Sequence, residues 1–145
     1  MKKISRSALL PFSAEQMYQL VNDVEAYPIF LPWCADAKVL EQGAGFMVAS
    51  VTIAKAGVHQ TFVTRNHLVP GQRIEMQLVE GPFQALSGEW SFKVLDAQAC
   101  KVMFEISFEM KQGLLSSAIG MVFEQIASTL VEAFCQRAKQ VYGGG

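Results

Sequence analysis

The side chains of this sequence that could bind a metal ion stand too far apart to share one. His59 and His67 are the only histidines, and they lie eight residues apart at odd positions of one expected strand. At the rise of a β-strand, the two rings would project from one face roughly 26 Å apart. We therefore expect no metal site, and both histidines at the surface or at the edge of a sheet.

Three acidic residues could supply the carboxylates that general acid–base catalysis needs. Glu89, Glu105 and Glu109 each alternate with apolar residues in their segments. This alternation places them on the sheet face opposite the apolar side chains, in water. The sequence also contains no Ser-His-Asp arrangement, no GxSxG motif and no phosphate-binding glycine loop. We therefore expect no catalytic residues and no enzymatic activity.

Thr64 and Asn66 are polar residues at positions that should face inward. They share the strand parity of Phe62 and Leu68, and alternate residues of a strand lie on one face. A buried asparagine needs hydrogen-bond partners. Two interpretations follow: nearby backbone groups satisfy the amide, or the amide donates to a ligand. A quinone carbonyl only accepts hydrogen bonds, so it would suit the amide donors of Asn66.

The composition indicates an apolar interior and gives no sign of a nucleic-acid partner. Hydrophobic residues make up 51% of the 145-residue chain and charged residues 17%, against about 25% charged in typical domains. The net charge is −1, so the basic footprint expected of a DNA-binding protein is missing. Cys34, Cys100 and Cys135 form no C-x-x-C pair, which favours reduced thiols in the cytoplasm.

The pattern along the chain predicts a strand, two short helical pieces, about six more strands and a long helix. Residues 3–10 alternate as a strand, and Ser13 with Gln16 forms a capping box that opens a helix over residues 11–24. Two prolines interrupt the aromatic segment 25–33, which predicts a turn or a short helix. From residue 35 to 110 the alternation is that of antiparallel strands. The last helix is expected from Leu114 to Tyr142.

One long helix cannot fill the whole concave face of a twisted sheet of about seven strands, so this order predicts a cavity between helix and sheet. We expect its walls to comprise Phe62, Thr64, Asn66, Met76, Trp90, Phe104, Phe108, Ile119, Val122, Phe123 and Ile126. The proline-broken segment would close one end, with Tyr27, Phe30, Leu31 and Trp33 at the rim. These rim residues could form a lid that opens or a plug that stays shut.

Four segments in order resemble the coenzyme Q-binding branch of the START-like, polyketide cyclase-related superfamily, in its bacterial RatA-type members. These are "FSAEQMYQLVNDVEAYPIFLPWC", "TFVTRNHL", "GPFQALSGEWSF" and "VEAFCQRAKQVY". The resemblance spans Ile4 to Tyr142. It implies an α+β helix-grip fold, in which a curved antiparallel sheet wraps the C-terminal helix around a lipophilic cavity. It also implies binding of an isoprenoid quinone or a similar lipid, and, for the bacterial branch, a toxin-like action on the large ribosomal subunit that hinders subunit association.

We interpret the chain as one START-like domain over residues 1–142, with a flexible tail at 143–145. The expected function is non-enzymatic binding of an isoprenoid quinone in support of respiration, with no cofactor other than such a bound ligand. The alternatives are a factor that binds the large ribosomal subunit and, third, a cyclase-type enzyme. We expect a cytoplasmic protein, peripheral to the inner membrane, that touches lipid transiently through its rim.

Overall fold

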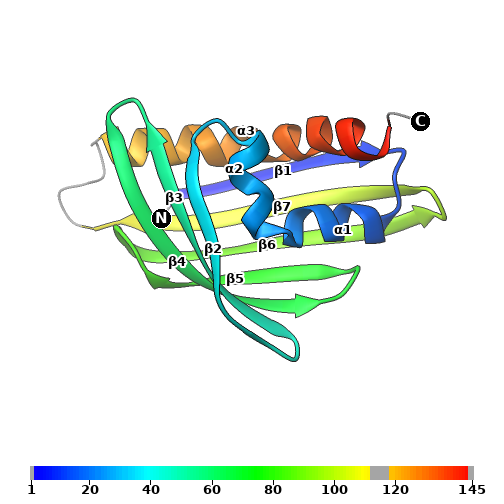
Figure 1. Ribbon diagram of the computed structural model, residues 1–145, viewed down its shortest axis with the longest axis horizontal. Helices are drawn as coiled ribbons and strands as arrows, with labels where there is room; N and C mark the ends of the chain where they lie inside the picture. The colour runs from blue at the N-terminus through cyan, green and yellow to red at the C-terminus, as the bar shows by residue number, and fades with distance from the viewer. Residues whose placement is uncertain (1, 112–117, 144–145) are drawn as a thin grey trace.

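The structure is a computed structural model that describes residues 2–111 and 118–143 (Figure 1). Its helices and strands follow one another as β1 (Lys2–Leu10), α1 (Ala14–Asn22), the 3₁₀ helix η1 (Val24–Ala26), α2 (Tyr27–Phe30), β2 (Cys34–Gly43), β3 (Phe46–Lys55), β4 (Val58–Val69), β5 (Arg73–Glu80), β6 (Phe83–Asp96), β7 (Ala99–Met110) and α3 (Ala118–Tyr142).

The strands form one antiparallel sheet of seven strands in the order β1-β7-β6-β5-β4-β3-β2. Figure 1 shows the sheet curving and α3 lying across it, while α1 packs against β6, β7 and α3. The first strand therefore pairs with the last, and β2 forms the opposite edge. This arrangement confirms the predicted α+β helix-grip fold, including the two short helices after the first strand.

The start of α1 confirms the predicted capping box. The Ser13 hydroxyl accepts a hydrogen bond from the Gln16 amide at 3.1 Å, and the Gln16 side chain accepts one from the Ser13 amide at 3.0 Å. These two bonds satisfy amide groups that a helix start otherwise leaves unpaired. The following proline-rich segment forms η1 and α2, and the chain turns extended at Leu31, just before Pro32.

The alternation of the strands decides what faces α3. In β7 the residues Val102, Phe104, Ile106, Phe108 and Met110 are buried, while Glu105 and Glu109 are exposed. His59 and His67 lie exposed on β4, as predicted. The apolar face of the sheet therefore meets α3, and the charged face is open to water.

Helix α3 supplies the other side of the core. Its buried residues include Phe123, Ile126 and Phe134. The most apolar window of this helix has a mean hydropathy of 1.3, enough by length and composition to cross a membrane. In this fold, however, the helix packs on the sheet as a core helix. The predicted start at Leu114 lies outside the described residues, as do residues 144 and 145 of the predicted tail.

Candidate ligand-binding cavity

A cavity of about 90 Å³ lies between the sheet and α3. Strands β3 to β7 contribute most of its wall, α3 closes it on one side, and the segment from η1 to the start of β2 closes one end. The residues around it are Val24, Tyr27, Trp33, Ala49, Val51, Ile53, Phe62, Thr64, Asn66, Met76, Leu86, Trp90, Phe104, Ile106, Phe123, Ile126, Ala127 and Leu130.

Thr64 and Asn66 introduce hydrogen-bonding side chains into this largely apolar wall. Both side chains are buried, and the Thr64 hydroxyl donates to Oδ1 of Asn66 at 2.8 Å. Their inward direction is as predicted from strand parity. The hydrogen-bond partner of the Asn66 amide oxygen is therefore a neighbouring side chain. From the sequence, nearby backbone groups had been considered as its partners. Because this bond uses the carbonyl end of Asn66, the amide nitrogen is the end left to donate to another acceptor.

Aromatic rings form the most closely packed part of the wall. The ring centroids of Trp90 and Phe104 lie 4.4 Å apart, and Trp90 meets Phe134 of α3 edge-on at 5.3 Å. Phe62 meets Phe123 edge-on at 5.9 Å, across the gap between β4 and α3. Such pairs stabilise the packing beyond the area that they bury.

The proline-broken segment closes one end of the cavity with only part of its predicted rim. Tyr27 and Trp33 line the cavity, and the Tyr27 hydroxyl donates to the backbone oxygen of Val21. Burial raises the pKa of Tyr27 well above its usual value, so this hydroxyl stays protonated and can donate. Phe30 and Leu31 lie elsewhere: Phe30 faces a separate surface groove, and Leu31 packs in a second apolar cluster with Val24 and Cys34.

Three predicted wall residues do not border the cavity. Phe108 is covered by Phe83 and Phe123, with ring centroids 6.3 and 4.8 Å away. Ile119 lies in the first turn of α3, one turn before Phe123, and is not among the lining residues. Val122 precedes Phe123, and neighbouring residues of a helix point about 100° apart. The side of α3 that faces the cavity is formed by Phe123, Ile126, Ala127 and Leu130.

The wall contributed by β3 escaped the sequence analysis. Ala49, Val51 and Ile53 line the cavity, and Ala49 pairs directly with Thr64. These residues alternate with Ser50 and Thr52, so the sequence does carry a signal for this inward side. Pairing the segment with β4 in a hairpin would have supported the same assignment, because cross-strand partners share a face.

Among the described residues, Tyr27 is the one titratable side chain that lines the cavity. Glu89 and Glu105 are direct cross-strand partners on the outer face of the sheet, and Glu109 is exposed on the same strand as Glu105. Within residues 2–111 and 118–143, no three His, Cys, Asp or Glu side chains are placed to hold a metal ion. The cavity therefore offers shape, apolar surface and two polar side chains to a ligand.

Comparison with known proteins supports this view of the fold. The family described as "Polyketide cyclase / dehydrase and lipid transport" matches residues 10–135. The chain belongs to this family. A START superfamily protein from Mycobacterium smegmatis has the same fold, with a TM-score of 0.80 at 19% identity over 96% of this chain and 98% of that chain.

Two relatives place the chain within the polyketide cyclase and lipid transport family, and they confirm the resemblance noted from the motifs. A protein of Vibrio cholerae named "Ribosome association toxin RatA" is 53% identical over 143 residues, covering 99% of each chain. The "Coenzyme Q-binding protein COQ10 homolog B, mitochondrial" of Xenopus laevis is 33% identical over 143 residues, covering 96% of this chain and 59% of that protein.

Proposed function

We propose that the protein binds an isoprenoid quinone in the cavity between the sheet and α3. The observation that carries this proposal is the placement of the Thr64–Asn66 pair in a wall that is otherwise largely apolar. Ligand pockets commonly combine an apolar lining with a few polar groups that fix orientation. The apolar wall suits an isoprenoid chain, and the Asn66 amide suits a ring carbonyl.

The cavity would have to widen to admit such a ligand. Its volume of about 90 Å³ lies below the roughly 300–1,000 Å³ of typical ligand pockets. Met76 and Leu130 are wall residues that are only half-buried, and methionine side chains adapt easily. The end formed by Tyr27 and Trp33 is built on short helical turns, which separate more readily than paired strands.

The family supports a lipophilic ligand in general and a quinone in particular. Lipid transport is part of the description of the matching family, and the Xenopus relative is named for coenzyme Q binding. The cyclase part of the same description favours a third function, catalysis. Glu89, Glu105 and Glu109, the carboxylates considered for acid–base chemistry, lie on the outer face of the sheet as expected, so we propose binding without catalysis.

Quenching of tryptophan fluorescence tests the quinone proposal. Trp33 and Trp90 both line the cavity, and a quinone ring accepts electrons and quenches nearby indoles. A short-chain ubiquinone analogue should therefore quench both residues saturably, as seen separately in Trp33→Phe and Trp90→Phe. A fatty acid should compete without quenching by itself. Saturable fatty-acid binding with no saturable effect of any isoprenoid quinone would leave only a general lipid pocket.

Association with the ribosome is a second candidate function, and one finding favours it specifically. The Vibrio relative named for ribosome association matches 53% of residues over nearly the whole of both chains. Such a role would place the protein in the cytoplasm. Cosedimentation with purified large ribosomal subunits in low salt and in high salt tests it. Recovery of the protein with the subunits, and loss of subunit joining, are expected; a protein that stays in the supernatant at every salt concentration would exclude it.

Transient contact with a membrane is a further part of the proposal, and the structure changes which residue should make it. Leu31 is buried, whereas Ile29 of α2 is 72% exposed beside the cavity-closing segment. Brief insertion of Ile29 would bring that end of the cavity to the lipid. Transfer of a quinone analogue from vesicles should be slower in Ile29→Asp than in the matched control Val79→Asp, another exposed apolar residue. Equal rates would argue against this contact.

A further inference from the structure

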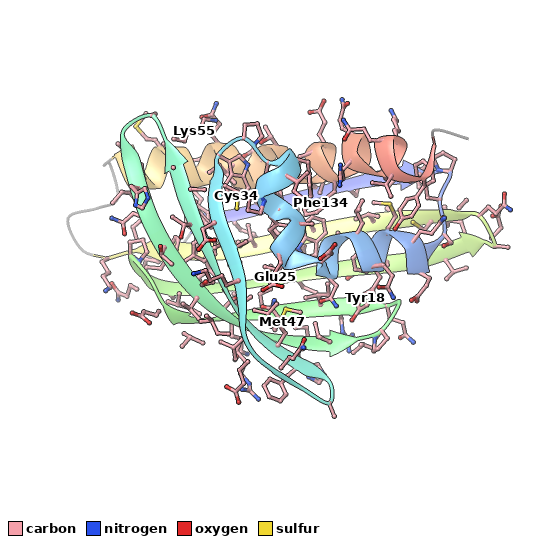
Figure 2. The ribbon with its side chains drawn as sticks, in the orientation of Figure 1. Tyr18, Glu25, Cys34, Met47, Lys55 and Phe134 are labelled. Carbon is pink, nitrogen blue, oxygen red and sulfur yellow. The ribbon has the colours of Figure 1, made fainter. Side chains whose placement is uncertain are left out.

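A second hollow of about 500 Å³ lies on the surface, on the other side of Val24 from the cavity. Its walls are the end of α1, η1, the neighbouring parts of β2 and β3, and the last turns of α3. We call it the α1–α3 groove. Figure 2 labels two of its residues, Glu25 and Met47, near the point where β2 and β3 pass the end of α1. The first and last of the four segments that carry the family resemblance meet here.

Two unpaired polar atoms belong to residues of this groove. Among the described residues, Oδ1 of Asn22 and Nε of Arg137 are the buried side-chain polar atoms without a hydrogen-bond partner. Both residues line the α1–α3 groove, Asn22 from α1 and Arg137 from α3. Buried polar atoms are nearly always paired, so an unpaired acceptor and an unpaired donor in one groove are unusual. A ligand that complements them carries a donor and an acceptor, as a peptide group does, and the two side chains turn toward the groove to meet it.

Arg137 is held in place while its Nε remains unpaired. Its guanidinium carbon lies 5.0 Å from the centroid of the Phe30 ring, within the range of a cation–π contact. Within residues 2–111 and 118–143 it forms no ion pair with a carboxylate. The side chain is therefore oriented by stacking, and its nitrogen atoms can donate to a carbonyl oxygen.

The charge of the groove favours a basic partner. Asp23 and Glu25 both line it and both are exposed. Arg137 is the single cation among its described residues, so its carboxylates outnumber its cations. A phosphate backbone would face these carboxylates, whereas a lysine or arginine side chain would pair with them.

The edge strand of the sheet runs beside the same groove. Strand β2 is the last strand of the sheet, and its residue Val39 borders the groove. The Val39 amide donates to Oε2 of Glu25 at 3.2 Å instead of to another strand. Unpaired strand edges commonly receive extended peptides.

From these observations we propose that the α1–α3 groove binds an extended segment of a protein partner that is rich in lysine or arginine. A peptide group of the segment donates to Asn22 and accepts from Arg137, and its basic side chains pair with Asp23 and Glu25. This site is separate from the cavity, and its occupant is independent of the quinone. If the protein associates with the ribosome, the groove contacts a basic segment of a ribosomal protein and does not contact RNA.

Fluorescence anisotropy with labelled peptides tests the groove directly. The probe is a short peptide of alternating lysine and serine with blocked ends, compared with a glutamate–serine peptide and a short single-stranded RNA. We expect saturable binding of the lysine peptide and much weaker binding of the other two. Asp23→Asn combined with Glu25→Gln should weaken binding of the lysine peptide about tenfold.

Two further variants distinguish recognition of the peptide in the groove from general electrostatic attraction of the peptide to the protein. Glu75→Gln combined with Glu89→Gln removes the same charge from the outer sheet face and should leave binding of the lysine peptide unchanged. Arg137→Met keeps an apolar stem on Phe30 but loses the Nε donor, so it should weaken binding. Circular dichroism shows whether each variant folds. Three results would each overturn the proposal. The first is an equal loss of lysine-peptide binding in the two charge variants, the second is stronger lysine-peptide binding by Arg137→Met, and the third is tighter binding of the RNA than of the lysine peptide by the wild type.

Discussion

Asn66 reaches the cavity because it shares one side of β4 with Phe62 and Thr64, which also line the cavity. The inward direction of Asn66 could be predicted from the sequence, since Phe62 and Leu68 share its strand parity. Its hydrogen-bond partner could not be predicted. The Thr64 hydroxyl that donates to Oδ1 of Asn66 is a neighbour on the same face of the same strand, and the bond depends on the rotamers of both side chains. Residue-level polarity was therefore predictable, and the hydrogen-bond partner was not.

A double-mutant cycle measures this pair. Asn66→Leu leaves the buried Thr64 hydroxyl without its acceptor, and Thr64→Val leaves the Asn66 oxygen without its donor. Each change should lower the free energy of unfolding by about 1–3 kcal/mol. The double variant should cost less than the sum by about 1 kcal/mol, because no unpaired partner remains. Urea denaturation gives all four values; strict additivity would mean that the bond contributes nothing.

The Cys34 thiol provides a prediction about pH. Burial raises the pKa of Cys34 to about 11, so the fold favours the neutral thiol over the thiolate. Because the pKa in the folded state lies above that in the unfolded state, the resulting stability is present below pH 9. It is lost as pH rises from there toward 11.

The comparison of wild type with Cys34→Ala isolates that effect. Urea midpoints measured from pH 8 to pH 10.5 should fall more steeply in wild type than in the variant. Parallel curves would show that ionisation of Cys34 does not differ between the folded and unfolded states.

Helix α3 illustrates how far the elements themselves could be predicted. The apolar character of its first half correctly indicated a helix in the core. Val122 and Ile119, also assigned to the cavity wall, are not among the residues that line it. The apolar residues of this half surround the helix, so the sequence did not separate Val122 from the neighbouring Phe123, which does line the cavity. Among the strands, β7 alternates between apolar and polar residues and was oriented correctly, whereas the alternation of Ala49, Val51 and Ile53 with Ser50 and Thr52 in β3 was not used.

Ala127 tests which side of α3 faces the cavity. It is 3% exposed and lines the cavity of about 90 Å³. Ala127→Leu adds three carbon atoms to that space, so it should abolish saturable quenching by a ubiquinone analogue. Leucine suits a helix nearly as well as alanine, and the free energy of unfolding should fall by no more than about 1–3 kcal/mol.

Ala118→Leu makes the same change at an exposed position at the start of α3. Quenching by the ubiquinone analogue should be unchanged in this control. Normal quenching in a folded Ala127→Leu variant would mean that the ligand lies elsewhere.

At the scale of the whole molecule, the order of elements was enough to predict a sheet that wraps a helix and leaves a cavity. The size of that cavity was not predictable, since it depends on sheet curvature and on how side chains such as Met76 and Leu130 fill the space. The α1–α3 groove was not foreseen either. It forms where two segments more than a hundred positions apart meet, with Asn22 on one wall and Arg137 on the other. Those walls come together only in the folded chain.

The cavity and the α1–α3 groove are two separate hollows, one lined mainly by apolar residues and one that carries Asp23 and Glu25. Val24 borders both of them. This arrangement allows one protein to hold a lipophilic ligand inside and a protein segment outside. It is consistent with a family whose members are named both for coenzyme Q binding and for ribosome association.

The central claim, that the cavity holds an isoprenoid quinone, is tested most directly by the lipid that accompanies the purified protein. Organic extracts of the wild type and of Ala127→Leu, expressed and purified in the same way, are compared by mass spectrometry. We expect an isoprenoid quinone in near-equimolar amount with the wild type and its loss from the variant. Extracts that contain only fatty acids or phospholipids, or equal amounts of quinone with both proteins, would contradict the claim.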